Sequence, residues 1–174
     1  SHTDRERPET SETEPKIENT TKISGTVYDE TGKPVPDAYV SIPRIFRFKG
    51  SNTDENENFS INASFDKYRE NEKPYLIIRQ KQKNLAAAAE IKDKTENINV
   101  TLLQGITFSG KVVDPNENGI QNAKISWIAW TSEAGNIVEE PVEISKDGSF
   151  QINALPAGFK YSFFSEANDY GHDG

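Results

Sequence analysis

The same strand–turn–strand pattern occurs twice in the chain. Residues 23–42 read "ISGTVYDETGKPVPDAYVSI", and residues 108–127 read "FSGKVVDPNENGIQNAKISW". The two stretches align without a gap at an offset of 85. The identical positions include Ser24 and Ser109, Gly25 and Gly110, Val27 and Val112, Asp29 and Asp114, Ala38 and Ala123, and Ser41 and Ser126. Internal repetition of this kind is typical of duplicated structural units, so we expect two similar units.

The match extends further along the chain. "ENFSINA" (57–63) is echoed by "GSFQINA" at an offset of 91, so the second copy has gained six residues, which we place in a loop or extra hairpin at 131–141. "PYLIIR" is then echoed by "KYSFFS", with Tyr75 against Tyr161. The second copy has no counterpart of "LAAAAEIKDKTENINVTLL". We expect either that the second unit is C-terminally truncated or that another segment supplies its missing edge, because an unpaired apolar edge promotes association.

Within each copy the apolar residues alternate with period two, which indicates half-buried β-strands. The shared-face sets are Ile23, Gly25 and Val27; Ala38, Val40 and Ile42; Phe59 and Ile61; and Ile98, Val100 and Leu102. The spacers "DETGKP", "DPNENG" and "SKDGS" are rich in turn-forming residues. "NLAAAAEI" (84–91) has helical propensity, but it is short and lies between strands, so we interpret it as a strand packed through its alanines. The pattern predicts an all-β chain of two tandem antiparallel β-sandwiches.

Composition limits the classes of protein. Residues 1–21 contain one strongly apolar side chain, Ile17, among charges, Thr and Pro, so we expect a disordered linker there. The chain starts with Ser-His and contains no Met, so we expect a processed form or a fragment of a longer protein. The formal net charge of −8 argues against general nucleic-acid binding, which depends on Lys and Arg. No apolar run is long enough for direct membrane insertion.

The sequence offers little for catalysis or metal binding. It has no Cys, and its two His, His2 and His172, lie near the ends, so no Ser-His-Asp arrangement is expected. "DPNENG" at 114–119 resembles the start of a calcium loop, but the acidic ligand needed at position twelve is Ile125, so we interpret the stretch as a turn. Lys111 could be considered for a covalent cross-link, but the alternation places it facing water. We therefore expect no enzyme activity, no metal and no cofactor.

Two features could bind a partner. Arg79, Lys81 and Lys83 would share one face of a strand if the strand continues, and this face either binds an anionic glycan or acidic protein or is simply solvated. Trp127 is expected in the core. Trp130 falls on the opposite face, where it either stacks on a sugar or anchors a protein interface, or is covered by a neighbouring segment.

The repeated motifs resemble the carboxypeptidase regulatory-like domain. Its pattern of G-x-V-x-D, a Gly/Pro turn, A-x-V, a hairpin with Asp and Gly before a Phe, and an L-P-x-G segment before a Tyr is nearly complete in the second copy, through Asp147, Gly148, Phe150, and Leu155 to Tyr161. The first copy departs from it, with Glu57 at the hairpin glycine and no L-P-x-G segment. The resemblance implies a transthyretin-like, Ig-like Greek-key sandwich that is noncatalytic and accompanies other domains outside the cytoplasm.

These observations predict three segments: a linker at 1–21, a first sandwich at 22–104 and a second sandwich at 105–174. The predicted function is an extracytoplasmic accessory or spacer module of a larger bacterial protein, in the periplasm or at the cell surface, whose partners are the neighbouring domains. The alternative is a carbohydrate- or protein-binding module that uses Trp130 or the basic strand.

Overall fold

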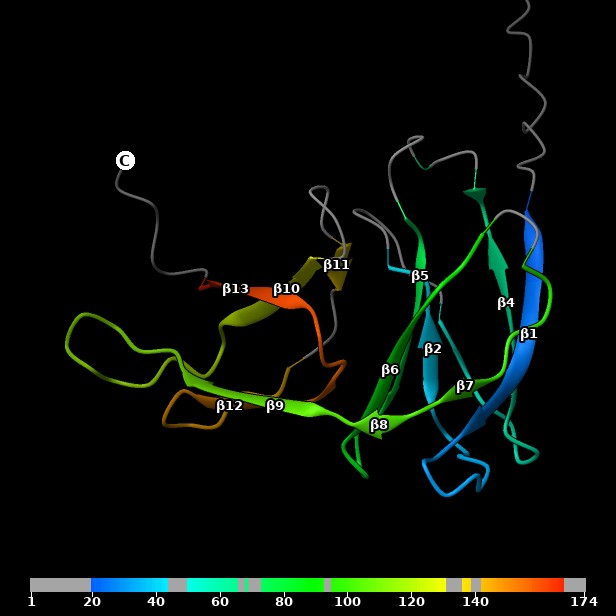
Figure 1. Ribbon diagram of the computed structural model, residues 1–174. Helices are drawn as coiled ribbons and strands as arrows, with labels where there is room; N and C mark the ends of the chain where they lie inside the picture. Colours follow the sequence, from blue (N-terminus) through cyan, green and yellow to red (C-terminus); the bar gives the residue numbers. More distant parts are fainter. Residues whose placement is uncertain are drawn as a thin grey trace, which may run out of the picture.

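The computed structural model describes residues 20–43, 50–65, 68, 73–92, 95–130, 136–138 and 142–167. Within these residues the chain is all-β, and its strands form two pairs of sheets (Figure 1). Of the linker predicted at 1–21, residues 1–19 lie outside the described residues. Its last residue, Thr21, is the first residue of the first strand instead. No described helix is long and apolar enough to cross a membrane.

The N-terminal pair of sheets comprises β1 to β8. In one sheet β1 (Thr21–Tyr28) lies between β4 (Asn58–Ala63) and β7 (Val100–Thr101). The other sheet has the order β3-β2-β5-β6-β8. Its strands are β2 (Tyr39–Ser41), β3 (Ser51–Asn52), β5 (Tyr75–Gln80), β6 (Leu85–Glu90) and β8 (Leu103–Gln104).

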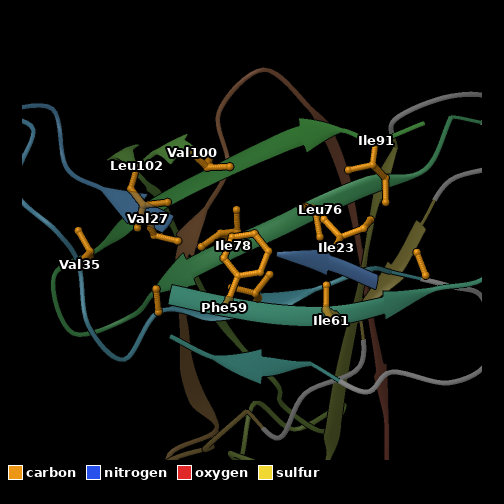
Figure 2. Close-up of a cluster of buried hydrophobic side chains, with 13 residues drawn as sticks. Ile23, Val27, Val35, Phe59, Ile61, Leu76, Ile78, Ile91, Val100 and Leu102 are labelled. Carbon is orange, nitrogen blue, oxygen red and sulfur yellow. The ribbon is translucent and has the colours of Figure 1, made fainter. Parts of the chain in front are cut away.

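Figure 2 shows the hydrophobic core between these two sheets. Alternate residues of β4 point inward, so Phe59 and Ile61 are buried while Ser60 between them is exposed. Ile23 and Val27 of β1 meet Leu76 and Ile78 of β5 in the same cluster. Each fully buried aliphatic side chain contributes about 1.5–3 kcal/mol. The core faces predicted from period two, including Val100 and Leu102, are confirmed.

The C-terminal pair of sheets repeats part of this arrangement. One sheet has the order β11-β10-β13, and the other contains β12 and β9. The bounds are β9 (Ile106–Lys111), β10 (Lys124–Trp130), β11 (Asn136–Val138), β12 (Ser149–Leu155) and β13 (Lys160–Glu166). Trp127 is fully buried in its core, as predicted, and the rings of Phe108 and Phe163 stack with their centroids 3.6 Å apart. β11 forms a hairpin with β10 in the region where an inserted hairpin or loop was expected; 131–135 and 139–141 lie outside the described residues.

The repeated aspartates close equivalent turns. The Asp29 carboxylate accepts hydrogen bonds from the backbone N–H of Thr31 and Lys33, at 2.9 and 3.0 Å. The Asp114 carboxylate accepts from the N–H of Asn116 and Asn118, both at 2.8 Å. Asp side chains favour such turns because they bond to the backbone a few residues ahead. The interpretation of 114–119 as a turn is therefore confirmed, and the repeated motif builds scaffold.

Of three further details, two differ from the sequence prediction and one confirms it. β7 runs parallel to β1, although antiparallel pairing was expected throughout. Tyr75 and Tyr161, which the sequence alignment matched, point to opposite faces: Tyr161 packs against its own core, whereas Tyr75 contacts Phe159 outside its core. The predicted strand at 84–91 is confirmed, because β6 covers Leu85–Glu90.

Candidate functional site

The most distinctive site of the molecule is the junction where the C-terminal pair of sheets covers the outer face of β5 and β6. Side chains of β5 alternate between two cores: Leu76 and Ile78 belong to the N-terminal cluster, and Ile77 belongs to the C-terminal cluster. The ring of Tyr75 meets Phe159 edge-to-face at 5.7 Å. β5 is consequently buried on both faces, whereas an antiparallel sheet commonly has one of its faces in water.

Arg79 is the charged residue at the centre of this junction, and only 3% of it is exposed. Its Nε donates a hydrogen bond to the carbonyl of Ala154 at 2.8 Å, and its Nη2 donates to the carbonyl of Asn153. Its Cζ lies 5.2 Å from the centroid of the Trp127 ring. A guanidinium is costly to bury, and the two carbonyl acceptors and the face of the ring stabilise Arg79 in this position.

The two carbonyls are available because β12 is irregular at this point. The register of β12 with β9 shifts between Ile152 and Leu155, and Ala154 has a positive φ of 58°. A bulge of this kind leaves backbone groups outside the ladder and bends the strand. Here the released carbonyls of residues 153 and 154 accept from Arg79.

Asn84 ties the same bulge to the segment that joins the two pairs of sheets. Its Oδ1 accepts from the N–H of Ala154 at 2.7 Å, and its Nδ2 donates to the carbonyl of Gly105 at 3.1 Å. Its own carbonyl accepts from the N–H of Gly105 at 2.7 Å. A Cβ on Gly105 would lie 2.7 Å from the Cα of Ala154, so a side chain at this position requires the backbone to shift.

The alanine run of β6 fits the junction by its small size. Ala86 and Ala88 lie opposite Arg79 and Ile77 across the β5–β6 ladder, so they share the face that meets the C-terminal sheets. Ala86 is buried, and Ala88 packs against the C-terminal cluster. Ala87 and Ala89 pack instead against the N-terminal cluster. The small alanine side chains therefore let other sheets pack on both faces of β6 more closely than larger side chains would allow.

Tyr161 supports the C-terminal side of the junction. Its ring lies 5.7 Å from that of Trp127, and its hydroxyl donates to the carbonyl of Pro156 at 2.5 Å. Burial raises the pKa of Tyr161 well above its ordinary value, although the nearby Arg79 charge acts in the opposite direction. The phenol thus keeps its proton near neutral pH. The junction holds two parts of the chain together through these contacts.

The structure separates the three basic residues predicted to share a strand face. β5 ends at Gln80, and residues 81–84 form a turn, so the strand does not continue and the condition for a shared basic face is not met. Arg79 points into the junction, whereas Lys81 and Lys83 are exposed. Lys81 lines an open groove of about 570 Å³ together with Glu143 and Asn153. The period-two pattern does not extend to Lys81 and Lys83 because the chain turns directly after Gln80.

The structure also places the other candidates. Trp130 lies on the face opposite Trp127, as predicted; it is half-buried, and its Nε1 donates to Ser162 Oγ at 3.0 Å. The Lys111 side chain is 51% exposed and lies 3.6 Å from the Asp147 carboxylate, so it faces water as predicted. Among the described residues, no group of three or more His, Asp or Glu side chains is placed to hold a metal ion.

Sequence reasoning missed Asn84, Gly105 and the second role of the alanines. One signal was present. "YLIIRQ" and "LAAAAE" lack the polar residue at every second position that a half-exposed strand would have. Near-continuous apolar runs are typical of strands covered on both faces. That absence could have predicted a covered sheet, although not the residues that cover it.

Comparison with known proteins does not assign the chain to a family. No protein-family model matches it. No curated protein matches it either. Among solved structures, it is similar to a streptococcal ancillary pilin, at 13% identity and a TM-score of 0.31 over 89% of this chain, and to the pilus backbone of Streptococcus pneumoniae, at 13% identity and a TM-score of 0.31 over 90% of this chain. The chain spans 60% and 56% of those two proteins, and at these TM-scores neither identifies its fold family or its function.

Proposed function

We propose that the chain is a noncatalytic spacer in which two sandwiches, at 22–104 and 105–174, are joined into one stiff body. The observation that carries this proposal is the burial of Arg79 of the first unit against the backbone of the second. Two domains linked only by a flexible segment would move independently by default. A buried guanidinium that depends on the other unit for its acceptors disfavours such movement.

The stiffness has three contributions in the described residues. The Arg79 and Asn84 hydrogen bonds fix the bulge of β12 to β5 and to the turn that follows it. Ile77 and Ala88 place apolar surface of the first unit in the second core. Gly105 follows β8 directly and is held by hydrogen bonds on both sides of its peptide, so the connection has little slack. Separation of the units would expose each of these groups together.

We further propose that the spacer belongs to a larger bacterial protein and works outside the cytoplasm, where it sets the distance between neighbouring domains. The support is the motif resemblance to carboxypeptidase regulatory-like domains in both copies, together with the described turns, which the repeated Asp29 and Asp114 close in the same way. The role needs no reactive group, which agrees with a junction built from a guanidinium, amides and a protonated phenol.

The test is backbone ¹⁵N relaxation of the whole chain. In a stiff spacer, the amides of β1–β8 and the amides of β9–β13 share one rotational correlation time. The Arg79→Met variant should make the two correlation times diverge, because it removes one of the three contributions that hold the units together, whereas Lys83→Met at the neighbouring exposed turn should leave one value. Different correlation times for the two units of the unmodified chain would refute the spacer proposal.

A further inference from the structure

Among the described residues, no strand pairs with the side of β13 that faces away from β10, whereas β6 pairs with the corresponding side of β5 in the first copy. The C-terminal sheet has the order β11-β10-β13, and the matching strands of the N-terminal sheet have the order β3-β2-β5, followed by β6. β6 pairs antiparallel with β5 over six residues. In the described part of the chain, no strand occupies that side of β13 (Figure 1). In the first copy, the corresponding position of the sheet thus holds an antiparallel strand.

The sequence of β13 is complementary to itself when it is reversed. It reads "KYSFFSE", with Lys160 as its first residue and Glu166 as its last, and both are exposed. If a second β13 runs antiparallel and the two strands cross at Phe163, Lys160 stands opposite the partner's Glu166. The two-fold symmetry repeats this pair at the other end. Opposite charges directly across a ladder are favourable, and like charges are unfavourable.

The outward face of the strand favours the same alignment. Phe164 is 50% exposed, and in this register it stands opposite the partner's Ser162. Ser162 Oγ accepts from Nε1 of Trp130, which is itself half-buried. The ring of Phe164 would thus be placed beside the partner subunit's Trp130. Pairing would cover two large aromatic side chains that the single chain leaves partly in water.

We propose that a second copy of this chain pairs with β13 to form a two-fold symmetric dimer with one continuous β-sheet. The proposal goes beyond the spacer role and does not depend on it. A second copy satisfies the charges at both ends of the strand by symmetry alone. The net charge of −8 opposes association, but salt screens charges beyond about 8 Å at physiological ionic strength, so the contacts at the strand decide the outcome. The paired edge is small, so the dimer is weak and reversible.

The test is sedimentation equilibrium of the whole chain over a wide concentration range, with a charge-swap series. Lys160→Glu replaces two attractive pairs by two repulsive ones, and we expect the dimer dissociation constant to rise about tenfold. Glu166→Lys should weaken it similarly. The double variant restores both pairs with reversed signs and should recover most of the lost affinity. A monomer at every concentration, or a double variant no better than the single ones, would overturn the proposal.

Two controls separate association from folding. Glu166 also faces Lys124 across the β10–β13 ladder, so Glu166→Lys carries a cost within the chain that Lys160→Glu does not. Thermal unfolding of each variant shows whether it is folded. Lys22→Glu makes the same change of net charge on β1, and it should leave the dissociation constant unchanged. An equal loss of affinity in Lys22→Glu would attribute the effect to net charge and overturn the strand pairing.

Discussion

Replacement of Arg79 by Met tests the junction most directly. Met retains much of the apolar length of the Arg side chain but donates no hydrogen bond. The variant leaves the carbonyls of Ala154 and Asn153 without the donor that they have in the native junction. It also removes the guanidinium that lies 5.2 Å from the Trp127 ring centroid. Its effect is therefore a measure of how much the second unit depends on one side chain of the first.

The expected magnitude follows from these contacts. A hydrogen bond from a charged donor contributes about 1.5–3 kcal/mol, and a partly desolvated cation–π contact contributes about 1 kcal/mol. Part of this sum is offset, because the variant no longer has to desolvate a guanidinium. We expect a net loss of about 2–3 kcal/mol in the free energy of unfolding. With a urea slope of about 2 kcal/mol per M, this is a shift of about 1 M in the unfolding midpoint.

Equilibrium urea unfolding, followed by Trp fluorescence and by far-UV circular dichroism, measures this loss. Trp127 lies in the C-terminal core, so the fluorescence reports on that unit, whereas the dichroism reports on all the strands. Lys83→Met is the matched control, since Lys83 is exposed at the turn that follows β5. A loss of less than about 0.5 kcal/mol for Arg79→Met, the range of ordinary surface substitutions, would show that the buried guanidinium does not hold the units together.

Two further predictions concern the repeated turns. Glu57 has a φ of 59° where the second copy has Gly148, so Glu57→Gly should raise the free energy of unfolding by about 0.5–1 kcal/mol. Gly148→Ala should lower it, because a Cβ there would lie 2.0 Å from the Val112 carbonyl oxygen. Thermal unfolding that shows the opposite signs would contradict the turn assignment. The pKa of Asp29 is lowered from its ordinary value of 3.8 by hydrogen bonds, chiefly from the Thr31 side chain, so its stabilising contribution is present above pH 3.8 and is lost as the pH falls through the folded-state pKa. Asn keeps an acceptor oxygen but does not titrate, so the urea midpoint of Asp29→Asn should fall less steeply in acid, and a profile parallel to that of the unmodified chain would argue against this role.

The strands and their core faces could be predicted because period two is a local property of the sequence. A shared face can be recognised within three residues, as for Phe59 and Ile61 or for Ile125 and Trp127. The repeated Asp of each turn is equally local, since it bonds to backbone groups only a few positions ahead. Copy-to-copy comparison then confirmed that the same local rules operate twice.

The junction could not be predicted, because its contacts join residues about 70 positions apart. Arg79 alternates correctly along β5, but alternation does not say whether the second face meets water or another sheet. The bulge that frees the carbonyl of Ala154 depends on a register shift in a different strand. The parallel direction of β7 could not be predicted either, because a strand of two residues does not indicate whether it pairs parallel or antiparallel with its neighbour.

The parallel pairing of β1 with β7 also decides how the first unit meets tension along the chain. The chain enters at the start of β1 and leaves from the end of β7 toward β8, so a pull on both sides slides these two strands past each other. The backbone hydrogen bonds between Ser24 and residues 96 and 98, and from Leu102 to Tyr28, then lie across the direction of force and must yield together. An antiparallel strand in that place would instead peel away one bond at a time. A single-molecule pulling experiment would register the difference as one abrupt high-force extension of the first unit.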